Sequence, residues 1–157
     1  MVRVLVIGCG NRDRGDDAAG ILVVRRLREC GVEAREHVSD GLALIDAWSE
    51  AEYVILVDTV ITGAPPGTIS GAMGADAAVL RSATTCSHSF DVAAAIELAR
   101  ALDRMPGSLK IYGIEGCAFE LGTEPQPAVL AAAERVANLV LAEVKRLESA
   151  GARGPQA

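Results

Sequence analysis

The stretch VRVLVIGCGNRDRGDDAAG, residues 2–20, predicts how the chain begins to fold, because it joins a buried strand to a helix through a glycine-rich loop. Residues 2–7 contain a short apolar run, Val4 to Ile7, and are typical of a buried strand. Residues 17–30 place Ile21, Val24 and Leu27 on one stripe, which predicts a helix. A strand, a glycine-rich turn and a helix in this order are the opening of an α/β fold.

The rest of the chain repeats this alternation of strand and helix. Further strands are predicted at 32–37, 53–58, 67–72 (as an edge strand) and 109–114, and further helices at 42–48, 89–102 and 126–148. The pattern predicts one α/β domain over residues 1–148, with a twisted, mostly parallel sheet of about five strands flanked by helices on both faces. Residues 149–157 are predicted to be a disordered tail.

Composition narrows the classes of function. Half of the 157 residues are hydrophobic and only 3% are aromatic, so the core is expected to be aliphatic. The net charge of −6 disfavours binding to nucleic acid or to an anionic membrane surface. No stretch resembles a signal peptide or a membrane span, so a cytoplasmic location is expected. The four widely spaced cysteines form no C-x-x-C pair, which favours free thiols over a zinc site.

The glycine-rich loop does not match the nucleotide-binding motifs. A dinucleotide fingerprint needs a glycine where Asp13 stands, and a P-loop needs Lys-Ser or Lys-Thr where Asp16 and Asp17 stand. Carboxylates at a helix start also compete with phosphate for the same N–H groups. Asp16 is expected to cap the helix. Asp17 either adds to the same dipole interaction or has a functional role, and the residues alone leave both open.

Two more polar residues are predicted near the carboxyl ends of the strands, where ligands bind in open α/β sheets. Asp58 ends an apolar strand, where a charge is costly unless it is paired, part of a turn or functional. His88 opens the helix predicted at 89–102 and is either a core histidine or a base or metal ligand. Together with Asp17, these side chains would make a divalent-metal site with open positions.

Four segments together resemble the hydrogenase maturation proteases, which trim the large subunit of nickel–iron hydrogenases. They are VLVIGCGNRDRGDDAAG, VILVDTV, TTCSHSFDVAAAIELARAL and IYGIEGCAFELGTEPQPAV, and they run across the chain to about residue 148. The resemblance implies a cytoplasmic endopeptidase with a single α/β domain. Its partner would be a nickel-loaded large-subunit precursor, from which it removes a C-terminal extension.

The resemblance also implies roles for individual residues. Asp17, Asp58 and His88 correspond to the metal-contacting and catalytic positions, with Asp16 left as the cap. Gly10, Asn11 and Gly41 are the implied substrate contacts. No tightly held cofactor is expected, because the substrate would supply the nickel. A monomer is expected.

Alternatives remain open at this point. Nickel would either polarise the scissile carbonyl or activate water, or it would only license binding while Asp17 or Asp58 acts as the base. A non-catalytic nickel-binding or chaperone-like partner of a metalloenzyme precursor would use the same three residues. A Cys–His hydrolase would use Cys9 or Cys86 with His88.

Overall fold

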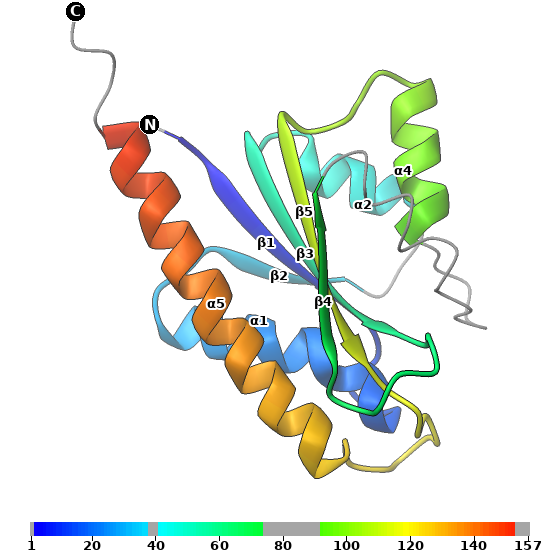
Figure 1. The fold of residues 1–157 in the computed structure, drawn as a ribbon. Coiled ribbons are helices and arrows are strands. Elements are labelled where there is room, and N and C mark those ends of the chain that lie inside the picture. Colours follow the sequence, from blue (N-terminus) through cyan, green and yellow to red (C-terminus); the bar gives the residue numbers. More distant parts are fainter. Residues whose placement is uncertain (1, 38–40, 74–91, 153–157) are drawn as a thin grey trace, which may run out of the picture.

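The fold is a sheet between two helical layers, as the computed structural model describes it for residues 2–37, 41–73 and 92–152. Within that part of the chain, α1 and α5 cover one face of the five-stranded sheet, and α2 and α4 cover the other (Figure 1). In chain order the elements are β1 (Val4–Cys9), the 3₁₀ turn η1 (Gly15–Ala18), α1 (Ala19–Glu29), β2 (Ala34–His37), α2 (Gly41–Trp48), β3 (Tyr53–Val60), β4 (Ile69–Met73), α4 (Val92–Ala101), β5 (Ser108–Glu115) and α5 (Pro127–Ala152). The predicted fold class, with helices on both faces, is confirmed.

The strand order explains where a site can form. The sheet runs β2-β1-β3-β5-β4, with β4 antiparallel to β5 at the edge and the other pairs parallel. The edge strand predicted at 67–72 is therefore confirmed as β4. From β1 the chain goes to β2 on one side and returns to β3 on the other. This reversal makes the gap between β1 and β3 the topological switch point, where open α/β sheets bind ligands.

The strand residues alternate between two apolar layers. In β1, Val4 and Val6 belong to the core under α1 and α5, whereas Leu5, Ile7 and Cys9 belong to the core under α2 and α4. Both layers are mainly aliphatic, as the composition predicts. Trp48 is fully buried in the second layer, where its indole N–H donates to the carbonyl of Arg104 at 3.0 Å.

The last helix is longer than predicted. α5 runs from Pro127 to Ala152, so the prediction of a disordered tail is wrong for residues 149–152, and residues 153–157 lie outside the described part. The reason is packing against the start of the chain: a β-carbon built on Gly151 would lie 2.4 Å from a methyl of Val2. Among the helices that the structure describes, none is long and apolar enough to cross a membrane.

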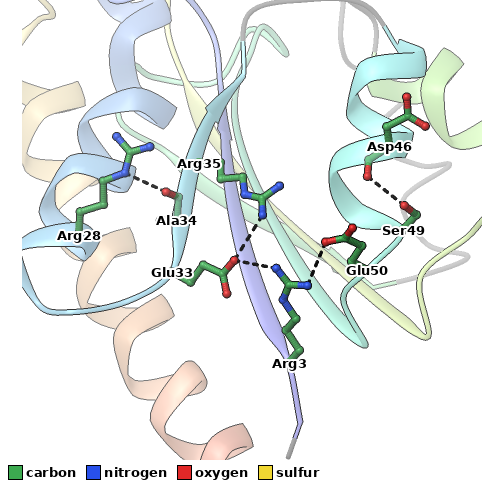
Figure 2. Close-up of polar contacts among 8 residues, drawn as sticks. All are labelled: Arg3, Arg28, Glu33, Ala34, Arg35, Asp46, Ser49 and Glu50. Atoms are coloured by element: carbon green, nitrogen blue, oxygen red, sulfur yellow. Dashed lines mark hydrogen bonds and ion pairs between the residues drawn. The ribbon is translucent and has the colours of Figure 1, made fainter.

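Exposed ion pairs lie at the end of the sheet where the parallel strands begin. Figure 2 shows Arg3 between Glu33 and Glu50, with each N···O distance 3.1 Å. The same figure shows Arg28 of α1 donating to the carbonyl of Ala34 in β2, at 2.8 Å. These contacts lie at the ends of the strands opposite to the switch point, so they do not touch the candidate site.

Candidate active site

The candidate site begins where β1 and β3 part. Their pairing ends at Gly8 and Val57, while β3 continues beside β5 as far as Val60 and Glu115. Asp58 is therefore the first residue of β3 beyond its pairing with β1. The prediction that the strand ends at 58 is wrong by two residues, because β5 continues to pair with β3 after β1 has ended.

The alternation of side chains along β3 shows which face of the sheet the Asp58 side chain lies on. Ile55 and Val57 belong to the core under α1 and α5, so Asp58 faces the opposite layer, under α2 and α4. Cys9, the last residue of β1, faces the same layer. The Asp58 carboxylate is partly exposed and accepts the Thr59 N–H at 2.8 Å.

Asp17 lies in η1, folded back over the glycine-rich loop. Its carboxylate accepts the Asn11 N–H at 3.1 Å, and its carbonyl accepts the same N–H at 3.3 Å. Gly10 has φ +136°, and a β-carbon there would lie 2.1 Å from the Asp17 carbonyl oxygen. Only glycine permits both this backbone conformation and this close approach.

Asp17 and Asp58 both lie beside the end of β1, which is Cys9. Burial raises the pKa of the Cys9 thiol well above its usual value, and the charges of Asp58 and Asp17 raise that pKa further. The backbone agrees with this: Asp58 directly follows Val57, the partner of Gly8, and a β-carbon built on Gly10 would lie 3.5 Å from an Asp17 carboxylate oxygen. The structure therefore places Asp17 and Asp58 next to the end of β1, at the switch point. Their roles in catalysis and metal binding stay predictions.

The third predicted residue, His88, lies outside the described residues. The helix that follows it, α4, covers the face of the sheet toward which Asp58 points. Within residues 2–37, 41–73 and 92–152, no three His, Cys, Asp or Glu side chains are placed to hold a metal ion. A set of three protein ligands would therefore need a residue from outside the described segments. The residue that the sequence analysis predicts for this position is His88.

The predicted substrate contacts fall at two places. Gly10 and Asn11 adjoin Asp17, and the Asn11 side-chain oxygen accepts the Asp13 N–H at 2.9 Å, which shapes the loop as an Asx turn. Gly41 starts α2, where a β-carbon would lie 3.3 Å from that of Ala95 in α4. The contact of these residues with a substrate stays a prediction.

Asp16 does not cap the helix, so that prediction is wrong. Neither η1 nor α1 has a side-chain cap hydrogen bond. The Asp16 carboxylate is instead fully buried and accepts the N–H groups of Cys117 at 2.9 Å, Ala118 at 3.0 Å and Gln126 at 2.8 Å, and also the side-chain amide of Gln126. Burial alone would raise the pKa of this carboxyl, but these hydrogen bonds outweigh burial and lower the pKa below its usual value.

Thr59 and Glu115 also lie near the candidate site, and the sequence analysis gave neither of them a role. The Thr59 hydroxyl, fully buried, donates to the Asp16 carbonyl at 3.0 Å. Glu115 is 3% exposed and accepts the N–H of Thr62 at 2.8 Å, its hydroxyl at 2.8 Å and the N–H of Gly63 at 3.0 Å. A charged residue at the end of an apolar strand was a usable signal for Glu115. No local pattern marks Thr59.

Comparison with known proteins agrees with this fold. The family model for hydrogenase maturation proteases matches residues 37–143, a range that includes Asp58 and His88 but not Asp17. The hydrogenase expression/formation protein HupD of Rhodobacter capsulatus is 30% identical over 134 residues, which are 81% of this chain. The chain spans 64% of the length of that relative.

Solved structures share the fold along nearly the whole chain. The hydrogenase maturating endopeptidase HybD from E. coli has a TM-score of 0.80 at 23% identity, covering 92% of this chain and 93% of that one. The hydrogenase 2 maturation peptidase from a Thaumarchaeota archaeon has a TM-score of 0.68 at 29% identity, covering 90% and 97%. Since the family model alone spans more than half of the residues, the chain belongs to the hydrogenase maturation protease family.

Proposed function

We propose that the protein is an endopeptidase that recognises nickel in the precursor of a nickel–iron hydrogenase large subunit and removes the C-terminal extension of that precursor. The observation that carries this proposal is the placement of Asp17 and Asp58 beside the end of β1, at the switch point of a sheet whose fold is that of maturation proteases. By the same family resemblance, the protein acts in the cytoplasm as a monomer and needs no tightly held cofactor.

The chemistry of the donors suits this role. Two carboxylates, with the imidazole of His88 as the proposed third ligand, would offer nickel an incomplete coordination shell. The substrate would fill the remaining positions, which makes cleavage depend on the metal that the precursor carries. Either carboxylate is also a suitable general base for an attacking water. Asp17 and Asp58 are therefore the residues proposed to act on the peptide bond.

A cysteine nucleophile at position 9 is disfavoured. Cys9 is 1% exposed, and burial together with the nearby charges of Asp58 and Asp17 raises the pKa of its thiol. A cysteine attacks as the thiolate, so a raised pKa and a buried sulfur both lower its reactivity. Cys86, the other candidate, lies outside the described residues.

The test is cleavage of a nickel-loaded large-subunit precursor from the same organism. Cleavage is monitored as the decrease in the mass of the precursor. Asp17→Asn, Asp58→Asn and His88→Ala should each lower the rate by about a hundredfold or more. Asp13→Asn is the matched control, because Asp13 belongs to the same loop but its side chain is 67% exposed. Cys9→Ser and Cys86→Ser should cleave like the wild type.

Each other outcome points elsewhere. Nickel-dependent binding of the precursor without cleavage would favour a chaperone-like partner. Loss of cleavage in a cysteine variant, with Asp17→Asn still active, would favour the Cys–His hydrolase. Cleavage that is independent of nickel would contradict the proposed recognition of the metal.

A further inference from the structure

A hydrogen bond joins the neighbours of the two acidic residues. Thr59 follows Asp58 in β3, and Asp16 precedes Asp17 in η1. The Thr59 hydroxyl donates to the Asp16 carbonyl at 3.0 Å, and both residues are fully buried. Since strand residues alternate, the Thr59 side chain lies on the α1 and α5 side of the sheet while Asp58 faces the other side.

This bond lies beyond the last pair between β1 and β3. That pairing ends at Gly8 and Val57, so residues 58 and 59 have left the β1 ladder. Past that point, the Thr59 hydroxyl links β3 to the loop that follows β1. The link therefore acts at the place where the segments bearing Asp58 and Asp17 would otherwise separate.

The acceptor in this bond is firmly anchored. The Asp16 carboxylate accepts N–H groups from Cys117, Ala118 and Gln126, and the Asp16 N–H donates to the Ala118 carbonyl at 2.9 Å. The donor is confined as well, because a β-carbon built on Gly116 would lie 2.8 Å from the Thr59 methyl. Both ends of the bond are therefore held by groups outside the candidate site.

We infer that Thr59 and Asp16 are a positioning pair. The hydrogen bond from the Thr59 hydroxyl to the Asp16 carbonyl sets the separation of the Asp17 and Asp58 carboxylates. Neither residue touches the reacting atoms. Small displacements of catalytic groups cost large factors in rate, so a fixed separation is functionally valuable. The catalytic consequence rests on the proposed function, whereas the structural consequence does not.

The hydroxyl can be removed without leaving its acceptor unpaired. The Asp16 carbonyl also accepts the N–H of Ala19 at the start of α1. Thr59→Val therefore keeps the branched shape and leaves the carbonyl hydrogen-bonded, while it deletes the link to β3. Thr59→Ser keeps the hydroxyl and deletes the methyl. Thr68→Val is the matched control, because the Thr68 hydroxyl bonds the carbonyl of Pro65 within an exposed turn.

The first measurement is amide hydrogen exchange by NMR at Asn11, whose N–H is bonded to the carboxylate and the carbonyl of Asp17. Exchange is expressed relative to the amide of Leu56, a fully buried β3 residue that reports global unfolding. Thr59→Val should raise this ratio about five- to tenfold, the factor expected for one lost hydrogen bond. Thr59→Ser and Thr68→Val should stay within about twofold.

The second measurement is cleavage of the nickel-loaded precursor. Thr59→Val should lower kcat about ten- to a hundredfold with little change in KM, and Thr59→Ser should restore most of kcat. An unchanged exchange ratio in Thr59→Val would overturn the inference, as would equal losses in Thr59→Val and Thr59→Ser. If the wild type does not cleave while the exchange ratio responds as expected, the positioning pair stands and the proposed function fails.

Discussion

Replacing Asp16 by asparagine should destabilise the fold, because asparagine keeps only one acceptor oxygen. Three N–H donors converge on Oδ2 of Asp16, from Cys117, Ala118 and the side chain of Gln126, and the main-chain N–H of Gln126 meets Oδ1. The better orientation of the asparagine keeps the first three bonds and sets its own amide against the last donor. One charge-assisted bond is lost, at about 1.5–3 kcal/mol, and one buried donor is left unpaired, at about 1–3 kcal/mol.

The expected loss is therefore about 2.5–6 kcal/mol, or about 5–24 °C in melting temperature for a chain of this length. The loss should depend on pH. Hydrogen bonds lower the pKa of the folded Asp16 carboxyl below its unfolded value of about 3.9. The stabilisation is thus fully present above that value and is lost as the pH falls through the folded pKa. The difference between wild type and Asp16→Asn should be constant between about pH 5 and 7 and shrink below about pH 4.

The assay is urea unfolding at several pH values, followed by the fluorescence of Trp48, the single tryptophan of the sequence. Asp46→Asn is the control, because Asp46 pairs with Arg104 on the surface and should change stability little at any pH. A loss of less than about 1 kcal/mol for Asp16→Asn would refute the count of hydrogen bonds. A difference that grows on acidification would refute the sign of the pKa shift.

Three further substitutions test other parts of the fold. Gly20→Ala should lower the free energy of unfolding by more than about 2 kcal/mol, because the new β-carbon would lie 2.5 Å from the Cys9 carbonyl oxygen and 2.6 Å from that of Val57. Thermal unfolding measures this loss, and a loss near zero would contradict the close approach of α1 to the sheet. Glu115→Gln should lower the free energy of unfolding by about 2 kcal/mol and speed proteolysis of the loop at 61–68, because the Glu115 carboxylate accepts two N–H groups of that loop. Unchanged proteolysis would contradict the conclusion that Glu115 anchors this loop. Arg3→Ala should shift the melting temperature by less than about 2 °C, with any shift vanishing in 1 M salt.

Sequence periodicity was sufficient to predict the sheet and its helices. β1, β3 and β5 carry runs of aliphatic residues, the residues of β2 alternate, and each helix has an apolar stripe. All of these signals are local. The errors concern contacts between distant residues. Asp16 looks like a helix cap because its neighbours favour one, but its partners lie 101–110 residues further along the chain. The end of α5 and the extra residues of β3 likewise depend on packing partners that no local pattern reveals.

The adjacent acids of the loop have different partners because of the turn that carries them. In a 3₁₀ turn, successive side chains point about 120° apart, so Asp16 and Asp17 cannot face the same way. Asp16 points into the fold, where N–H donors surround it, and Asp17 points over the loop toward Asn11. The Asp16 carboxylate fixes the turn to residues 117–126, which lie more than 100 positions further along the chain. Because the position of the turn is fixed by Asp16, the neighbouring Asp17 is directed over the glycine-rich loop, where its carboxylate accepts the Asn11 N–H.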